Sequence, residues 1–374
     1  MHLHRLQLTN FKNYEHNDLE FSPGINCFVG NNGVGKTNIL DAIHFLSLAK
    51  SFFSQTEGQN IRHGEDFFIV NGVISHESGD DTVICSFIRN RQKSLKRNGK
   101  EYERLSDHIG KYPAVMVSPA DSSLVTEGSE ERRKFLNKII SQYNSEYLDA
   151  LLNYNRALIS RNKLLKDYYG SGRFDEEMIS SYDLLLEKYG SIIHRERSSL
   201  VEKLIPLFQD YYDIISMKRE RVELVYRSQL NNAPLGQLLE GSRERDRYLQ
   251  YTTAGIHKDD LEFIMGGHPV RQLGSQGQQK SYLVSLKLAK FGYIAEMTGI
   301  TPLLLLDDLF DKFDSDRVEQ LIRLLGSHRF GQIFITDTNQ ERLHKILEGS
   351  TTDFKLFRIG SGGVEEIIQN GSTK

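Results

Sequence analysis

The strongest chemical signal in the sequence is the segment GNNGVGKT, which runs from Gly30 to Thr37. Its glycine and lysine spacing is that of a phosphate-binding loop, and it lies between an apolar strand-like run and an amphipathic helix-like run. In such a loop, backbone N–H groups and the helix N-terminus surround the phosphates, Lys36 contacts the β- and γ-phosphates, and Thr37 binds Mg²⁺. We therefore predict ATP and Mg²⁺ as ligands. The predicted nucleotide-binding residues of the loop are Gly30, Asn31, Asn32, Gly33, Val34, Gly35, Lys36 and Thr37.

A second candidate group follows the apolar run TPLLLL and consists of Asp307 and Asp308. A continuous apolar run is typical of a strand buried on both faces. Two acidic residues at a strand end can simply mark a turn. Because the chain also has a phosphate loop, we predict that Asp307 binds the metal together with Thr37 and that Asp308 orients or deprotonates the attacking water. The catalytic candidates are therefore Lys36, Asp307 and Asp308.

The segment SQGQQ, which begins at Ser275, precedes an amphipathic helix-like run. Ser275 would be a good helix cap, and capping is one explanation for it. The other is that Ser275, Gly277 and Gln278 supply uncharged donors to a γ-phosphate at a helix N-terminus. Because the phosphate loop already has its own helix, the second explanation requires ATP held by another copy of the chain. It therefore predicts a homodimer that forms when ATP is bound.

The elements expected around these motifs change in character along the chain. Short strand-like runs fill the first hundred residues, interrupted by a helix-like run at about 36–49. From about 129 to 250, apolar residues recur at the three- and four-residue spacing of helices. Strand-like runs at 301–308 and 332–336 then flank a helix-like run at 316–325, which indicates a parallel sheet.

We therefore predict an α/β fold in which a discontinuous ATPase domain encloses an inserted, mainly helical lobe. The ATPase domain is expected at residues 1–118 and 251–374, and the lobe at 119–250. Heptad repeats are not sustained in the lobe, so we expect it to be compact and not a long coiled coil.

The 374 residues include 47 Lys and Arg against 50 Asp and Glu, which excludes a globally basic nucleic-acid binder but leaves room for local patches. One basic segment surrounds the hairpin signal Asn98-Gly99, where it can follow DNA phosphates or, alternatively, protect a sheet edge from aggregation. The DNA-contact candidates in this basic hairpin are Arg89, Arg91, Lys93, Lys96 and Arg97. A second basic group, in the helical lobe, consists of Arg156, Arg161, Lys163 and Lys166. Both would contact phosphates, so we expect little sequence preference.

The location of the protein is predicted from what the sequence lacks. Cys27 and Cys85 have no metal-site or disulfide-framework spacing. The N-terminus does not resemble a signal peptide, and no run approaches the roughly 18 apolar residues of a membrane helix. We expect a reduced, cytoplasmic protein without a membrane segment.

In their order along the chain, the phosphate loop, the Ser275 turn and the acidic strand end resemble the motifs of the ATP-binding-cassette (ABC) ATPases. In that family the Ser-Gly-Gly-Gln turn of one subunit closes on ATP held by the other. Lys36 and Asp307 lie about 270 residues apart, which resembles the chromosome-maintenance and DNA-repair branch and, within it, most closely the RecF family. The matching segments include LTNFKNY at 8–14, SPADSSLVTEGSEERRKFLN at 118–137, GIHKDDLEF at 255–263 and SQGQQKS at 275–281. The resemblance implies an ABC-type head, a mixed sheet that carries the phosphate loop.

The resemblance also implies an ATP-dependent DNA-binding protein of recombinational repair and replication restart. Its implied partners are DNA, RecR and RecO, with RecA loaded indirectly at single-strand gaps. An ATP-bound dimer would clamp DNA, and weak, DNA-stimulated hydrolysis would release it. The resemblance places Lys12 and Asn13 near the nucleotide, the alternative being a solvated turn, and Asp314 in a dimer-facing loop.

Two positions depart from the cassette pattern. Asp308 stands where many members have a glutamate, and Thr336 or Asp337 where many have a switch histidine. Because Asp is one methylene shorter than Glu, we predict slow hydrolysis that acts as a timer. Two alternatives remain: a nucleotide-switched scaffold whose helical lobe recruits RecR, and a transporter or defence-type cassette, which the motif separation disfavours. His257 lies with Lys258 in a matching segment and has no assigned role.

Overall fold

The computed structural model describes residues 1–171, 175–327, 329–348, 353–360 and 363–369. The chain divides into two compact units. The first, the head unit, contains Met1–Ser122, Tyr211–Lys218 and Ser275–Lys374, and the second, the helical unit, contains Ser123–Asp210 and Arg219–Gly274. The helical unit therefore extends past residue 250, where the sequence placed its end, and a short segment inside the predicted lobe belongs to the head.

The central sheet of the head unit is mixed and has the order β15-β14-β3-β13-β12-β8. All neighbouring strands are parallel except the edge pair β14 and β15. The strands are β3 (Ile25–Val29), β8 (Ala114–Val117), β12 (Leu303–Asp307), β13 (Ile333–Asp337), β14 (Phe354–Gly360) and β15 (Gly363–Gln369). Every residue of β3, β12 and β13 is buried, which explains their continuous apolar sequences. Because the strands are parallel, the residues that follow β3 and β12 meet at one edge of the sheet.

The second sheet of the head unit is antiparallel and has the order β2-β1-β4-β5-β6-β7. Its strands are β1 (His2–Phe11), β2 (Tyr14–Glu20), β4 (Phe67–His76), β5 (Gly79–Ile88), β6 (Ser94–Arg97) and β7 (Lys100–Glu101). The expected turn between the last two strands is present, and both Asn98 and Gly99 have the positive φ that a two-residue hairpin turn requires.

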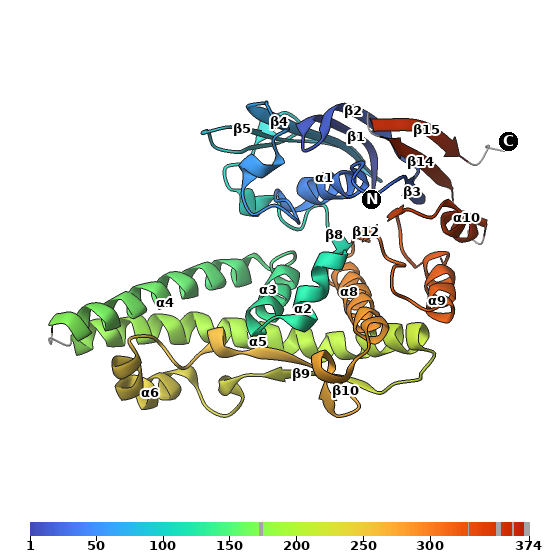
Figure 1. The fold of residues 1–374 in the computed structure, drawn as a ribbon. Coiled ribbons are helices and arrows are strands. Elements are labelled where there is room, and N and C mark those ends of the chain that lie inside the picture. The colour runs from blue at the N-terminus through green and yellow to red at the C-terminus, as the bar shows by residue number, and fades with distance from the viewer. Residues whose placement is uncertain (172–174, 328, 349–352, 361–362, 370–374) are drawn as a thin grey trace. The chain divides into compact units, whose positions relative to one another are not determined.

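Helix α1 (Lys36–Leu48) packs against strands of both sheets, as Figure 1 shows, and its apolar side chains form part of a continuous buried core with them. The other α-helices of the head are α8 (Gln276–Thr298), α9 (Ser315–Leu325) and α10 (Gln340–Glu348), with short 3₁₀ segments at Glu57–Asn60, Leu105–Asp107 and Pro119–Ser122. None of the helices in the described part of the chain is both long and apolar enough to cross a bilayer.

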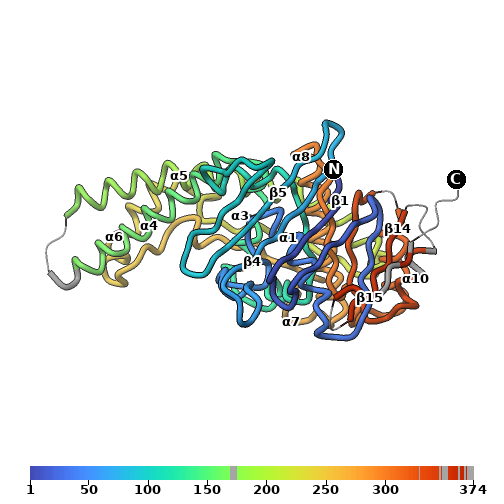
Figure 2. Tube along the Cα trace, turned by 90° about the horizontal axis from the view of Figure 1, so that it is seen from above, coloured from blue at the N-terminus to red at the C-terminus, as the bar shows by residue number. Residues whose placement is uncertain are grey.

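The helical unit is built on two long helices that lie side by side in Figures 1 and 2. Its elements are α2 (Ser123–Thr126), α3 (Ser129–Ile140), α4 (Ser145–Ser171), α5 (Glu176–Ser216), α6 (Leu235–Leu249) and α7 (Val270–Leu273), with 3₁₀ segments at Gln229–Asn231 and Ile256–Lys258. The last residues of α5, from Tyr211 on, belong to the head unit. Helix α5 has 41 residues and is about 60 Å long at 1.5 Å per residue. The helical unit is compact, as expected from the sequence, although it contains a helix of this length.

A small antiparallel sheet, β11-β10-β9, completes the helical unit. Its strands are β9 (Val222–Arg227), β10 (Asp260–Met265) and β11 (His268–Pro269). The sequence prediction missed β9 because its six residues follow a helical periodicity that continues through α5.

Candidate functional site

The phosphate loop joins β3 to α1 and closes tightly on its own backbone. Gly35 caps the helix with a φ of 111°, and a Cβ added there would lie 2.3 Å from the Asn13 side chain. A Cβ at Gly30 would lie 2.3 Å from the carbonyl oxygen of Ile359. Both positions therefore require glycine, as the sequence motif predicted.

Lys36 is buried at the first turn of α1. Its Nζ donates to the carbonyl oxygens of Gly30 and Asn31, each at 2.8 Å. These two partners are neutral, so they satisfy hydrogen bonds without neutralising the ammonium charge. A buried cation with neutral hydrogen-bond partners favours an anionic ligand, because an anion can supply a countercharge in direct contact. The residues present thus fit the phosphates of a nucleotide.

Thr37 and Asp307 are brought into contact by the parallel order of the central sheet. Thr37 Oγ1 donates to Asp307 Oδ1 at 2.8 Å across 270 residues of sequence. The same carboxylate accepts from Thr336 Oγ1 at 2.8 Å and from Ser118 Oγ at 3.3 Å. Hydroxyl and carboxylate oxygens are the ligands that Mg²⁺ prefers, so the predicted pair fits that ion.

Asp308 follows directly, with a positive φ of 42°. Its N–H donates to Thr336 Oγ1 at 3.1 Å, so one threonine links the two aspartates of the strand end. Burial raises the pKa of Asp308 above its ordinary value, and the negative charge of Asp307 adds to the effect while Lys36 opposes it. A carboxylate with a raised pKa is a better proton acceptor, which suits a general base.

Asn13 and its neighbour Tyr14 brace the phosphate loop from outside. Asn13 Nδ2 donates to the carbonyl oxygen of Val34 at 3.0 Å, and its Oδ1 accepts from Asn38 at 2.7 Å. Tyr14 donates to the carbonyl oxygen of Gly35 at 3.1 Å. These contacts place the exposed Asn13 beside the phosphate loop, and its contact with a nucleotide stays a prediction.

Lys12 has a positive φ of 54°, and its Nζ forms an ion pair with the fully buried Asp41 at 2.5 Å. Asp41 also accepts from Ser51 Oγ and from the N–H of Phe52. Lys12 therefore ties the turn between β1 and β2 to α1, and Asp41 in turn ties α1 to the loop that follows it. Asp41 was not predicted, since a lone acidic residue inside a helix gives no spacing signal.

An open hollow of about 700 Å³ lies beside these residues. It is lined by Lys12, Asn13, Ser54, Gln59, Ile61, Arg62 and His63. Asn13 contacts both the hollow and the phosphate loop.

Ser275 caps α8 and is exposed. Its Oγ accepts from the N–H of Gln278 at 3.3 Å, and the Gln278 side chain accepts from the N–H of Ser275 at 2.8 Å. This reciprocal pair is a capping box. The capping explanation is thus realised, while the exposure of Ser275 leaves its contact with a second copy as a prediction.

The basic hairpin lies on β5 to β7, and three of its five candidates have acidic partners. The pairs are Arg89 with Asp66, Lys93 with Glu57, and Arg97 with Asp81. The Lys93 side chain is only 14% exposed. Arg91 and Lys96 are exposed and remain the candidates best placed for DNA phosphates.

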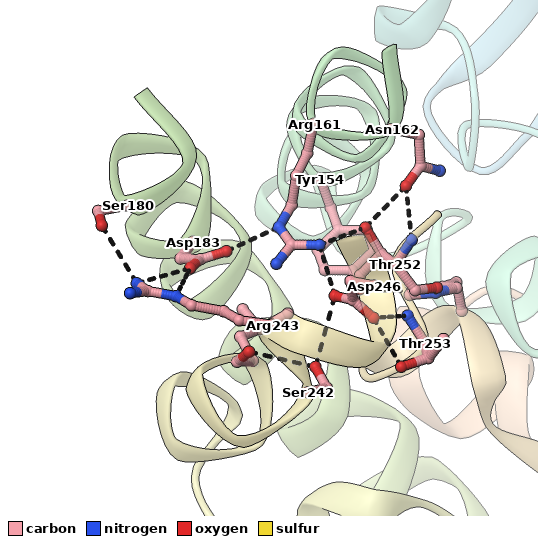
Figure 3. A network of polar contacts seen from close by, with 12 residues as sticks. Tyr154, Arg161, Asn162, Ser180, Asp183, Ser242, Arg243, Asp246, Thr252 and Thr253 are labelled. Atoms are coloured by element: carbon pink, nitrogen blue, oxygen red, sulfur yellow. Dashed lines mark hydrogen bonds and ion pairs between the residues drawn. The ribbon is translucent and has the colours of Figure 1, made fainter. Parts of the chain in front are cut away.

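Arg161, a member of the second basic group, is completely buried and is therefore not accessible to DNA. Figure 3 shows its guanidinium between two carboxylates: Nε donates to Asp183 and Nη1 to Asp246, each at 2.7 Å. Nη1 also donates to Thr252 at 2.8 Å. The prediction that Arg161 contacts DNA was therefore wrong, because the residue is part of a closed network that joins α4, α5 and α6.

The segment GIHKDDLEF also has a structural role in the helical unit. Buried Asp259 forms an ion pair with buried Arg197 at 2.9 Å and accepts from Tyr226 at 2.6 Å. His257 Nε2 lies 3.0 Å from the carbonyl oxygen of Thr252, and its Nδ1 lies 2.9 Å from Tyr154 Oη. Because a carbonyl only accepts, the proton is on Nε2, and Nδ1 accepts from the tyrosine. Burial lowers the pKa of His257 to about 4.

Comparison with known proteins identifies a matching family model and similar sequences. Residues 2–355 match the family model described as the RecF/RecN/SMC N terminal domain. The chain is 47% identical over 368 residues to the DNA replication and repair protein RecF of Bacteroides fragilis (strain YCH46), covering 98% of this chain and 99% of that protein. It is 48% identical over 367 residues to the RecF of Parabacteroides distasonis, covering 98% and 100%.

Solved structures agree with this assignment. A structure of the recombination mediator protein RecF with ATP in the RecFOR pathway matches with a TM-score of 0.85 and 28% identity, covering 98% of this chain and 97% of that one. The Smc head domain of Pyrococcus furiosus shares the fold, with a TM-score of 0.59, 17% identity and coverage of 98% and 96%. With an ABC-type head and identities near one half along almost its whole length, this chain belongs to the RecF family.

Proposed function

We propose that this protein is an ATP-dependent DNA-binding protein of recombinational repair and replication, which closes on DNA as a dimer when ATP is bound. The observation that carries the proposal is the 2.8 Å contact between Thr37 and Asp307 next to Lys36, whose hydrogen-bond partners are neutral carbonyl oxygens. Two segments 270 residues apart thereby form one polyanion site. The names of its relatives, which are DNA replication and repair proteins, support the class of substrate.

The proposed chemistry is the hydrolysis of ATP by residues of this chain. Lys36 leaves its carbonyl partners and contacts the phosphates, and the backbone of the loop from Gly30 to Thr37 surrounds them. Thr37 and Asp307 hold Mg²⁺, which adds positive charge at the phosphoryl oxygens when it is bound. Asp308 orients the attacking water and accepts its proton.

The proposed dimer uses Ser275, Gly277 and Gln278 of each copy against ATP in the other. The exposure of Ser275 at the start of α8 supports this arrangement, because a second copy of the chain can reach its side chain. Hydrolysis is proposed to be weak and stimulated by DNA, and to release the clamp. RecO and RecR are the proposed partners, on the strength of the RecFOR pathway named for the RecF–ATP structure, with RecA loaded indirectly.

DNA affinity measured with and without ATP tests the proposal. We expect fluorescence anisotropy on a labelled duplex to give at least about 10-fold tighter binding when Asp308→Asn protein is saturated with ATP and Mg²⁺, because hydrolysis is then slowed. Lys36→Met is the matched control and should bind DNA equally with and without ATP. Affinity that does not change with ATP would favour the nucleotide-switched scaffold instead.

Sedimentation of the wild-type and Ser275→Arg proteins with ATP tests the dimer separately. The wild-type protein should sediment as a dimer, and the arginine variant should remain a monomer because its side chain occupies the space of the γ-phosphate. A variant that dimerised normally would remove the Ser275 turn from the mechanism.

A further inference from the structure

Lys280 lies one turn after Ser275 in α8, on the side that faces the loop following β12. Its Nζ donates to two backbone carbonyl oxygens of that loop, Asp308 at 3.2 Å and Asp311 at 2.7 Å. The ammonium also lies 5.4 Å from the centre of the Phe313 ring. These contacts of Lys280 with the loop that carries Asp308 serve neither the capping of α8 nor the phosphate loop, so they need a separate explanation.

The peptide of Asp308 is held from both sides. Its N–H donates to Thr336 and its carbonyl oxygen accepts from Lys280. Asp308 has a positive φ, which a residue other than glycine adopts at a cost of about 1 kcal/mol or more. Such a conformation persists only when its surroundings enforce it, so the direction of the Asp308 carboxylate depends on these two bonds.

The environment of Lys280 is unfavourable for a charge. Burial lowers the pKa of Lys280 to about 8, while the carboxylates of Asp311 and Asp308 act in the opposite direction. Lys312 and Arg342 are nearby positive charges that lower it further. A neutral apolar side chain would fill this position at lower cost, so the two carbonyl bonds are the feature that only lysine or arginine provides.

A second link ties the same loop to the same helix. Arg317 Nη1 donates to Ser281 Oγ at 2.8 Å, and the N–H of Arg317 donates to Asp314, which caps α9. The start of α8 therefore contacts the loop at both ends, with Lys280 at the end that carries Asp308.

We propose that Lys280 is a positioning residue that fastens the Asp308 loop to the helix beginning at Ser275. Contact of Ser275 with ATP on a second copy of the chain is then transmitted through one helical turn to the hydrolytic carboxylate of the same chain. The inference rests on the proposed function, since it requires hydrolysis at Asp308 and closure at Ser275.

Lys280→Met tests this inference, because methionine keeps the length of the side chain and removes its donors. We expect kcat for ATP hydrolysis to fall about 10-fold with KM changed less than about 2-fold, and ATP-dependent dimerisation in sedimentation to persist. Lys280→Arg should restore kcat to within about 3-fold of the wild-type value, since it keeps the charge and the donors. Lys312→Met is the matched control, because it removes an exposed charge from the same loop and should change neither constant.

A readout independent of activity is amide hydrogen exchange of residues 308–314 in nucleotide-free protein. Lys280→Met should accelerate exchange there about 10-fold and leave α1 unchanged. If kcat and this exchange both match the wild-type values, Lys280 does not position the loop and the inference is wrong. If the wild-type protein neither dimerises nor hydrolyses ATP, the proposed function fails instead, and the exchange measurement still decides whether Lys280 holds the loop.

Discussion

In the head unit, Lys36 is buried against two neutral carbonyl oxygens, whereas in the helical unit Arg161 is buried between two carboxylates. Lys36 belongs to the phosphate loop and Arg161 to the second basic group, and the sequence marked both as contacts for phosphate. The carbonyl partners of Lys36 can be exchanged for phosphate oxygens, because giving them up leaves no charge unpaired. The partners of Arg161 cannot, because each would become a buried, unpaired anion. The charge state of the existing partner thus separates a ligand site from a structural network.

Lys36→Met tests whether a buried cation with neutral partners serves a ligand, and its effect on ATP hydrolysis should be the largest of those predicted here. Lys36→Met should reduce ATP hydrolysis by about 10³-fold, because the main positive charge opposite the phosphates is lost. Thermal unfolding of the variant should stay within about 2 °C of the wild-type protein, since only neutral carbonyls lose their partner. A large loss of stability would mean that Lys36 is structural, as Arg161 is.

Arg197 in the helical unit tests the other case, a buried cation paired with a carboxylate. Like Arg161 it is buried, and its partner is Asp259. Arg197→Met should lower the free energy of unfolding by about 3–5 kcal/mol, because it leaves a buried carboxylate unpaired. Denaturant unfolding followed by circular dichroism measures this. Arg197→Met combined with Asp259→Asn should recover part of the loss, and an unrecovered double variant would indicate that packing and not charge is responsible.

Asp308→Asn separates catalysis from binding within the head unit, because it removes a proton acceptor without removing a ligand-binding charge. Hydrolysis should fall by about 10²-fold, the usual range for loss of a general base. ATP affinity and ATP-dependent dimerisation should be retained. Equal losses of binding and hydrolysis would place Asp308 among the binding residues.

His257 makes the stability of the helical unit depend on pH. Its pKa is lowered to about 4 in the folded protein from an ordinary 6.5, so the unfolded chain binds the additional proton between these values. Stability should be fully present above pH 6.5 and should decrease as the pH falls towards 4, by about 3 kcal/mol. The His257→Gln variant should lose this component of the pH dependence in denaturant unfolding.

The smallest effect is expected for the exposed members of the basic hairpin. Changing Arg91 and Lys96 together to Gln should weaken DNA binding about 3- to 10-fold and reduce the salt slope by about 1 to 2, if both contact phosphates. Arg156→Gln with Lys163→Gln is the comparison on the helical unit. A change in affinity without a change in salt slope would argue against direct phosphate contact.

The features that could be predicted from the sequence are those set by residues close together in the chain. A phosphate loop is encoded within eight residues, and its glycines are required by contacts of the loop itself, so Gly30 to Thr37 were recognised directly. The position of Asp307 followed from the run of buried residues before it. Arg161 was misread because its partners Asp183 and Asp246 come from other helices, and no spacing rule connects them. Lys280 was overlooked for the same reason, since its partners are backbone carbonyls in a loop that the sequence does not place.

The division of the chain has a mechanical consequence. The backbone passes between the head and helical units four times, at 122–123, 210–211, 218–219 and 274–275. A protease that cuts one of these connections leaves three covalent links, so a single cleavage cannot release either unit. The last of the four connections ends at Ser275 itself. A force transmitted along the backbone from the helical unit at this connection therefore acts directly on the residue proposed to contact the second copy.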